Sequence, residues 1–415
     1  MEKYKEYKDS GVQWLGEIPS HWKVVLNGRI FKEDVRKALD TDISLSLSQK
    51  DGLIPTEEMQ ESSLKTSSYA NWKHVTPCDL VINRFKAHLG VMFASNYTGM
   101  VSFHYGVFKS VMPTNSKYFE YLFHTNVYKF LYADVSNGMT VGLQNLSNTA
   151  FYKVRGLYPP IAEQHSIVSY LDTKCSLLDT LLSNKEKQIS LLQEMKQRVI
   201  ADAVTRGVNP NVKFKATNIP WLPEIPEYWE MSKVSSHFRQ RNVKVSDKEY
   251  PALSVSKMGV TPQLDNVALS NAEGNSRKLV KIGDYAVNSR SDRKGSCGVS
   301  QYEGSVSLIT IVLEPFDIDR GYVHYLFRSN PWIEEFYRNG RGIVADLWTT
   351  NYQMMKGMYL PVPPLSEQRA IVSYITERTS KIDMLIEKLT KEIECIKEYK
   401  QRLISDVVTG QMKVC

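Results

Sequence analysis

The sequence predicts an α+β protein in which two globular domains are connected by two long helices that form an antiparallel coiled coil, with a pseudo-twofold internal repeat. Three observations lead to this fold class. One series of motifs occurs twice along the 415 residues. Each copy ends in a long segment without proline or glycine, and the segment before it differs between the copies. A chain of this length also exceeds one ordinary core, so two domains are expected.

The repeat is defined by two motifs and a shared helix end. The motif W-L-x-E-I-P-x-x-W spans residues 14–22 and returns at 221–229. The motif P-P-[IL]-[AS]-E-Q-x-x-I begins at Pro159 and again at Pro363. From there to the K-Q-R sequence near the helix end, the spacing is the same in both copies. Length differences fall only between the two motifs, where loops tolerate them.

The Pro-Pro pairs predict the starts of the two long helices. In the second copy, Ser366 is the expected N-cap and Glu367 the first-turn acid, whereas the first copy has Ala162 at the cap position. Neither proline nor glycine follows until Gly207 in one copy and Gly410 in the other. Each helix is therefore expected to span roughly 43 residues, or about 64 Å at 1.5 Å per residue.

Apolar residues in both long segments follow a 3-4 alternation, which predicts a coiled-coil seam. Only Lys185, the repeat equivalent of Leu389, interrupts this pattern. Because a globular domain lies between the two helices in sequence, we expect them to pair with each other and antiparallel; ordinary buried helices are the alternative. The predicted seam consists of Leu171, Leu178, Leu182, Ile189, Leu192, Val199, Ile375, Ile382, Ile386, Leu389, Ile393, Ile396, Leu403 and Val407.

The segments before the helices predict α+β domains of about 135 residues, each large enough for its own core. Val101–Val111 and Val306–Val312 are β-branched and predict strands, and Tyr118–Tyr132 and Arg320–Arg338 predict amphipathic helices. Glycine and prolines between the copies predict an extended linker. The predicted plan is an N-terminal segment 1–19, a first domain 20–158, a central helix 159–206, a linker 207–226, a second domain 227–360 and a C-terminal helix 361–415.

Composition restricts the class of protein only broadly. The net charge of +7 fits a polyanionic partner and also fits many ordinary proteins. The five cysteines contain no C-x-x-C pair, so free thiols are expected rather than disulfides or a zinc site. No run of 18 apolar residues or signal-peptide core occurs, which predicts a cytoplasmic location without membrane contact.

No motif of known catalytic chemistry occurs in the sequence. A phosphate-binding G-x-x-x-x-G-K-[ST] loop, H-E-x-x-H, G-x-S-x-G and G-x-G-x-x-G behind a strand are all missing. Arg369 stands at the position equivalent to His165, which argues against a shared catalytic histidine. Tyr158 and Val362 precede the proline pairs, so neither pair matches an adenine-methyltransferase loop. We therefore predict no catalytic, cofactor-binding or metal site in this chain.

The duplicated motifs, which span essentially the whole chain, resemble the specificity subunit of type I restriction-modification systems. This resemblance implies that each globular domain is a target-recognition domain reading one half of a bipartite, asymmetric site in double-stranded DNA. It implies that the coiled coil sets the spacing and docks two modification subunits, which carry S-adenosylmethionine. Restriction subunits, a motor-nuclease that uses ATP and Mg, would then join, and the chain itself would be a non-catalytic part of a prokaryotic defence complex.

Residues that contact DNA are expected on polar loops, because base edges are read by Arg, Lys, Asn, Gln, Ser or Thr and phosphates mostly by Arg and Lys. A dense polar loop follows a predicted strand of the second domain, and the first domain has an equivalent segment. For each residue the alternative is a solvated surface position. The candidates are Lys50, Asn83, Arg84, Lys86, His88, Lys257, Asn288, Arg290, Arg293, Lys294, Arg338, Asn339 and Arg341.

Two other classes of protein are alternatives to a specificity subunit. A self-contained nuclease or methyltransferase requires a metal or cofactor motif, and the sequence contains none. A coiled-coil adaptor without DNA recognition explains the helices, but it does not explain why two domains share a framework while their loops diverge. Salt-dependent DNA binding distinguishes the adaptor from a DNA-recognition subunit.

Overall fold

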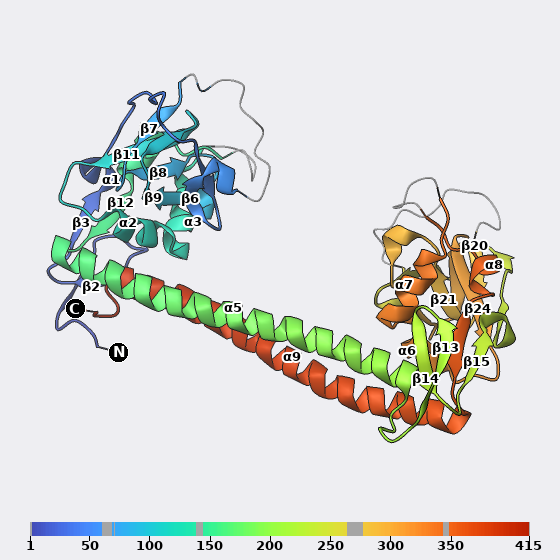
Figure 1. The fold of residues 1–415 in the computed structure, drawn as a ribbon. Helices are drawn as coiled ribbons and strands as arrows, with labels where there is room; N and C mark the ends of the chain where they lie inside the picture. The colour runs from blue at the N-terminus through green and yellow to red at the C-terminus, as the bar shows by residue number, and fades with distance from the viewer. Residues whose placement is uncertain are drawn as a thin grey trace. The chain divides into compact units, whose positions relative to one another are not determined.

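The structure is a computed structural model that describes residues 2–59, 69, 71–137, 144–263, 277–342 and 348–414. These residues form two compact units, Met1–Lys185 with Lys391–Cys415, and Glu186–Thr390. The division crosses both long helices, α5 (Ile161–Arg206) and α9 (Leu365–Val408). Each unit therefore consists of one globular domain and one end of each helix (Figure 1).

The first unit is built around a four-stranded antiparallel sheet in the order β4-β11-β8-β9. Two-stranded pairs, β1 with β2, β3 with β12, β5 with β6 and β7 with β10, surround it. The elements are β1 (Tyr7–Asp9), β2 (Glu17–Pro19), β3 (Lys23–Leu26), α1 (Asn27–Ile30), β4 (Phe31–Glu33), β5 (Leu45–Ser48), β6 (Gly52–Pro55), η1 (Thr56–Glu58), β7 (Lys73–Val75), β8 (Leu80–Asn83), η2 (Ala87–Leu89), β9 (Met92–Ala94), β10 (Gly99–Val101), β11 (Tyr105–Ser110), α2 (Ser116–Phe123), α3 (Asn126–Val135), α4 (Asn148–Lys153) and β12 (Arg155–Tyr158).

The second unit repeats this plan, with a four-stranded antiparallel sheet in the order β16-β24-β21-β22. Strand β15 pairs with β25 as β3 pairs with β12. The elements are β13 (Phe214–Ile219), β14 (Leu222–Pro226), β15 (Glu230–Lys233), η3 (Val234–Ser236), β16 (Phe238–Gln240), β17 (Lys244–Val245), β18 (Leu253–Ser256), β19 (Gly259–Pro262), β20 (Arg277–Val280), β21 (Tyr285–Asn288), η4 (Ser291–Arg293), β22 (Cys297–Val299), β23 (Gly304–Ser307), β24 (Thr310–Pro315), α6 (Arg320–Phe327), α7 (Asn330–Arg338), α8 (Tyr352–Met355) and β25 (Tyr359–Val362).

Several elements differ from those predicted. Val101–Val111 and Val306–Val312 each contain parts of two strands separated by a turn. Each predicted amphipathic helix is two helices, because Thr125 and Ser329 end the first one by donating their hydroxyls to the carbonyls three residues back. In the second domain Pro331 lies in the first turn of the next helix, and a proline has no N–H with which to continue the preceding helix.

The predicted linker 207–226 contains the hairpin β13–β14. Its Leu222 and Ile225 are buried in the core of the second unit. Hairpin β1–β2 occupies the equivalent place in the first unit, where Ile18 is buried. The repeated W-L-x-E-I-P-x-x-W motif is therefore part of each globular core.

Each core includes side chains from both long helices. In the first unit, Ile167 of α5 and Leu403 of α9 join the cluster around Trp22. In the second unit, the cluster around Trp229 includes equivalent or neighbouring residues of both helices, Ile200, Val204, Ile371 and Ile375. Tyr118 Oη donates to the carbonyl of Val408 at 3.0 Å in the first unit, and Tyr322 Oη to that of Val204 at 3.1 Å in the second. The helix ends are therefore integral to the two domains.

The E-Q pair of the second motif attaches the helix start to the W-L-x-E-I-P-x-x-W motif. Glu163 accepts a hydrogen bond from Trp22 Nε1 at 2.8 Å, and Glu367 accepts one from Trp229 Nε1 at 3.0 Å. Glu367 also accepts from Tyr228 Oη at 2.9 Å, and Glu163 lies 2.5 Å from His21 Nε2. Helix α9 begins at Leu365, so the predicted N-cap Ser366 is wrong: it lies inside the first turn.

The glutamine that follows this glutamate also attaches the helix start to the globular domain, and this attachment is here called the joint. Gln164 Nε2 donates to the carbonyl of Pro159 at 2.9 Å, while its Oε1 accepts from the backbone of Asn115. Gln368 makes the equivalent pair of bonds with Pro363 and Asp319. Both glutamines are fully or almost fully buried, at 0% and 1% exposure. A buried amide requires such partners, which explains why the motif is the same in both copies.

Within each unit the ends of α5 and α9 run antiparallel, as the ion pairs between them show. Lys400 bonds to Asp179 at 2.6 Å in the first unit, and the equivalent Lys196 bonds to Asp383 at 2.7 Å in the second. Every residue of the predicted seam is buried or half-buried. Lys185 turns its ammonium to Glu392 at 2.5 Å. The predicted fold class, two domains joined by a coiled coil, is confirmed.

Candidate nucleic-acid interface

Each domain carries a polar loop directly after the central strand of its sheet. The loop begins at Asn83 after β8 and at Asn288 after β21. The side-chain oxygen of Asn83 accepts the N–H of Phe85, and that of Asn288 accepts the N–H of Arg290, both at 3.1 Å. Such bonds stabilise a turn. The two asparagines therefore shape the loops, while the residues after them project from the sheet.

A second loop lies against the first in both domains. In the second domain, Arg341 and Thr349 exchange backbone hydrogen bonds, and Ser291 N donates to the carbonyl of Trp348 at 2.9 Å. In the first domain, Asn137 and Asn145 exchange the same pair of bonds, and Leu146 N donates to the carbonyl of Arg84 at 3.0 Å. The segments after β8 and β21, together with the described residues from 137 to 147 and from 338 to 350, are here called the two-loop surface. The structure thus brings together the two candidate segments predicted separately in the second domain.

In the second domain the two-loop surface is rich in exposed cations. Arg290 pairs with Asp292 at 3.0 Å, Lys294 with Glu334 at 2.9 Å, and Arg338 with Glu335 at 2.5 Å. The side chain of Arg293 is 67% exposed, and Arg341 is also exposed. Because exposed ion pairs contribute little to stability, Arg290 and Lys294 can exchange a carboxylate for a phosphate at small cost. Asn339, which follows the last residue of α7, donates its side-chain amide to the backbone carbonyl and the carboxylate of Glu335.

The cations border a hollow of about 710 Å³ in the second domain. Its lining includes Lys294, Arg338, Trp221 and Trp348. Trp221 packs edge-on against Trp332, with ring centroids 5.5 Å apart, so one wall is held by the core. The carboxylates of Asp292, Glu334 and Glu335 also line the hollow, so a polyanion would bind there by replacing them as partners of the two cations, with the tryptophans available to flat bases.

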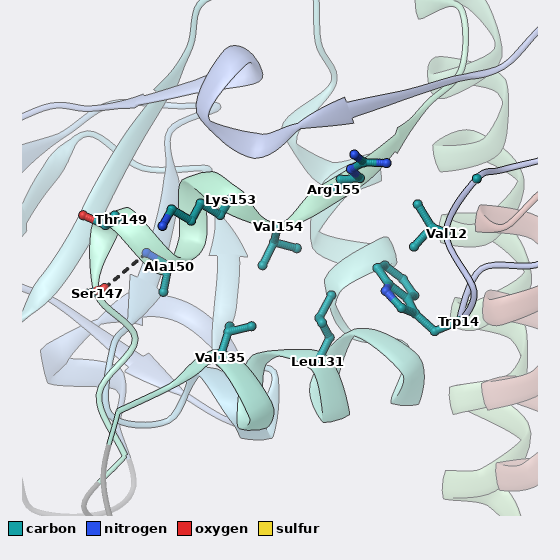
Figure 2. Close-up of a pocket in the computed structure, with 11 residues that line it drawn as sticks. Val12, Trp14, Leu131, Val135, Ser147, Thr149, Ala150, Lys153, Val154 and Arg155 are labelled. Atoms are coloured by element: carbon teal, nitrogen blue, oxygen red, sulfur yellow. Dashed lines mark hydrogen bonds between the residues drawn. The ribbon is translucent and has the colours of Figure 1, made fainter.

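In the first domain the equivalent hollow is lined by fewer charged residues (Figure 2). It measures about 630 Å³ and adjoins Ser147, where the two-loop surface meets α4. Trp14 forms one wall and packs edge-on against Tyr128, as Trp221 does against Trp332. Lys153 and Arg155 are exposed along its edge. The two domains therefore share a frame but differ in the chemistry of the same surface.

Arg84 occupies a different setting from the other candidates. Its Nη2 bonds to Glu33 at 2.7 Å and to Asn148 at 2.9 Å, and Lys73 also bonds to Glu33 at 2.9 Å. Burial raises the pKa of Glu33, but the hydrogen bonds and charges of Lys73 and Arg84 outweigh it and hold that pKa below its usual value. This half-buried network suits a structural role for Arg84, which supports the polar loop. Lys86 is exposed, and His88 is half-buried in η2.

Lys50 and Lys257 lie at the tips of equivalent hairpins, β5–β6 and β18–β19. Both are exposed, and the glycines that end the two turns, Gly52 and Gly259, have φ of 80° and 108°. Lys50 lines a hollow of about 590 Å³ with Leu89 of the polar loop and with residues of α9. The carbonyl of Lys257 accepts from Arg328 at 2.6 Å.

Sequence reasoning missed one group of residues beside this surface. The turns before β11 and β24 carry large exposed side chains, Phe103 and His104 in the first domain and Leu308 and Ile309 in the second. They were missed because each turn was assigned to the interior of a single strand. The available signal was their position between short β-type runs after Ser102 and Ser307.

Among the residues that the structure describes, no helix is long and apolar enough to cross a membrane. Nor do the described His, Cys, Asp and Glu residues contain a group of three placed to hold a metal ion. The described residues thus define a protein with an internal repeat, in which two like domains carry two unlike polar surfaces.

Comparison with known proteins specifies this class further. The chain is 27% identical over 287 residues to the putative type I restriction enzyme MjaX specificity subunit of Methanocaldococcus jannaschii, an alignment covering 66% of this chain and 63% of that protein. It is 24% identical over 298 residues to the MjaVIII specificity subunit of the same organism, covering 66% and 65%. The matched region is thus somewhat less than two thirds of these relatives. No protein-family model matches the chain.

Solved structures show the same fold. A chain of a type I R-M system, from a structure describing complex assembly and conformational transition, aligns with a TM-score of 0.73 and 14% identity, covering 95% of this chain and 99% of that one. The HsdS subunit of Thermoanaerobacter tengcongensis aligns with a TM-score of 0.55 and 14% identity, covering 95% and 98%. The protein is therefore similar in sequence to type I specificity subunits and has the HsdS fold, which confirms the predicted resemblance.

Proposed function

We propose that this chain is the DNA sequence-specificity subunit of a type I restriction-modification complex. Each domain reads one half of a bipartite, asymmetric site in double-stranded DNA through its two-loop surface. The observation that carries the proposal is that the two domains have the same scaffold of sheet and helix ends but different two-loop surfaces. The sheet, the joint and the helix ends repeat closely, whereas the loops on the same edge differ, as they must if two domains are to read two different sequences.

The paired helices supply a docking surface for two copies of a modification subunit. Large apolar side chains are exposed at equivalent positions, Leu181 and Leu385 at 42% and 50%, and Met195 and Tyr399 at 54% and 46%. Exposed apolar residues away from a core are typical of protein interfaces. Because each exposed side chain has an equivalent in the other helix, one asymmetric chain presents two similar surfaces. Binding of two identical partners requires such a pair of surfaces.

The catalytic steps are assigned to the partners. In this proposal the modification subunits bind S-adenosylmethionine, and the restriction subunits that join them use ATP and Mg. The specificity subunit is itself non-catalytic and holds no cofactor, and it acts in the cytoplasm, where its DNA substrate lies. The absence of the sequence motifs of nucleases and methyltransferases favours this division of roles.

Methylome sequencing tests the proposed function directly. A host carrying this chain with its modification subunit is expected to gain methylation at one motif made of two short unlike half-sites and an unread spacer. The matched control is a host carrying the modification subunit alone, which should gain none. A contiguous motif, or the same methylation in the control host, would overturn the proposal.

A further inference from the structure

Both domains carry two large exposed side chains in the turn that leads into the central sheet. In the first domain, β10 and β11 are separated by Ser102–His104, where Phe103 is 49% exposed and His104 is also exposed. In the second, β23 and β24 are separated by Leu308 and Ile309, which are 41% and 44% exposed. Turns ordinarily favour Gly, Asn, Asp, Pro or Ser, so large side chains, three of the four apolar, at the same place in both domains require an explanation.

These turns lie beside the two-loop surface. Tyr105, the first residue of β11, pairs with Asn83, and Thr310, the first residue of β24, pairs with Asn288. The turn therefore ends opposite the asparagine with which each polar loop begins. In the first domain, the ring of His104 lies 6.0 Å from that of Phe85, which belongs to the polar loop and is 45% exposed.

A lysine supports each turn from below. Lys73 Nζ donates to the carbonyl of Tyr105 at 2.9 Å, and the equivalent Lys278 Nζ donates to that of Thr310 at 2.8 Å. Both lysines are largely or half buried, and burial lowers the pKa of Lys278. The turn is thus held at its base, so its side chains project from a supported position.

The surroundings favour DNA as the occupant. Removing exposed apolar side chains from water lowers the free energy, and the polar loops that begin at Asn83 and Asn288 carry exposed cations such as Lys86 and Arg290. A polyanion with stacked flat bases satisfies both groups at once. Proteins that insert Phe, Leu or Ile between base steps unstack them and gain sequence preference from the deformability of the step.

We propose that Phe103 with His104, and Leu308 with Ile309, are wedges that unstack one base step in each half-site and so add shape-dependent specificity. This inference rests on the proposed function, because it assigns a role to residues at the same DNA-reading surface. It also assigns a different wedge chemistry to each domain, aromatic in the first and aliphatic in the second.

The test uses the full chain in complex with its modification subunit and an unmethylated DNA duplex. The duplex contains the recognition motif that methylome sequencing identifies. 2-Aminopurine replaces each adenine of the half-sites in turn, because its fluorescence rises when it unstacks. We expect increased fluorescence at one step per half-site. Phe103→Ser with His104→Ser should abolish it in one half-site only, and Leu308→Ser with Ile309→Ser only in the other. Affinity should fall about tenfold, with an unchanged salt dependence because no phosphate contact is removed.

Matched controls come from the far ends of the same sheets. Val111 follows β11 and is 57% exposed, and Ile282 precedes β21 and is 61% exposed. Their serine variants should bind and unstack DNA like the parent. If the wedge variants keep full fluorescence and still bind the motif specifically, the wedge is overturned and the proposed function is upheld. Loss of the modification subunit instead of DNA distortion assigns the turns to a protein partner and overturns the wedge. Absence of motif-specific binding by the parent complex overturns both proposals.

Discussion

At the residue scale, the repeated motifs are explained by hydrogen bonds rather than by catalysis. Glu163 and Glu367 each accept a tryptophan N–H, and Gln164 and Gln368 each bridge a proline carbonyl and a backbone N–H. A buried polar group without such partners costs about 1 to 3 kcal/mol. Trp, Pro, Glu and Gln are therefore needed at these positions in both copies of the repeat. The loops outside the joint carry no such requirement and are free to differ.

The carboxylate of Glu33 makes the stability of the first domain depend on pH. Its pKa is lowered from 4.5 because Lys73 and Arg84 outweigh the effect of burial. A lowered pKa adds stability that is present above the unfolded value and is lost as pH falls through the folded one. Glu33→Gln should lower the free energy of unfolding by about 1 to 2 kcal/mol at pH 7. The loss should vanish towards pH 3, as followed by urea unfolding.

The control for this prediction is Glu58→Gln, since Glu58 is an exposed carboxylate of the same domain. It should leave the unfolding curve unchanged at both pH values. A Glu33→Gln variant that loses equal stability at pH 3 and pH 7 would show that shape rather than charge matters at this position.

At the scale of elements, the coiled coil contains one charged interruption. Lys185 is the repeat equivalent of Leu389, and its side chain is only 18% exposed while its ammonium pairs with Glu392. Replacing a partly buried ion pair by an apolar contact is often stabilising. We expect Lys185→Leu to raise the free energy of unfolding by about 1 kcal/mol, because a leucine fills the seam and Glu392, 38% exposed, stays hydrated.

Thermal unfolding of the full chain measures this effect, with Lys187→Leu as the comparison because Lys187 is exposed on the same helix. The comparison variant should gain nothing. A lower melting temperature for Lys185→Leu would indicate that the ion pair with Glu392, and not the interrupted seam, stabilises this part of the helices.

At the scale of the whole molecule, both helices contribute to both units. An insertion in α5 alone would move its seam out of step with α9, because the two ends of each helix are packed in different cores. The matched change is one heptad after Glu186 and one after Thr390. Seven helical residues add about 10.5 Å, which corresponds to about three base pairs of DNA at 3.4 Å each. The methylated motif should keep both half-sites and gain a spacer longer by about this amount.

The single insertion in α5 is the informative control for the heptad experiment. It should reduce stability or methylation without producing a clean longer spacer, because only one partner of the seam has moved. Half-sites that change sequence in the double insertion would contradict a division of labour between reading domains and helices.

Much of the architecture follows from local pattern. A helix without proline or glycine and with apolar residues every 3.5 positions needs no distant information to be recognised. The duplicated motifs likewise give the pseudo-twofold plan, since equal spacing along the chain implies equal structure. Elements shorter than the pattern window were harder: Tyr118–Tyr132 reads as one amphipathic helix, yet the hydroxyl of Thr125 ends α2 inside it.

By itself the sequence determined the repeat, the two long helices, their seam and the kind of loop that would carry polar residues, because each depends on neighbours along the chain. Only the tertiary structure placed 288–294 beside 338–341, enclosed Arg84 in a network with Glu33, and exposed the turns at Phe103 and Leu308. These features depend on pairing between strands far apart in sequence, and no local pattern encodes which segments will meet.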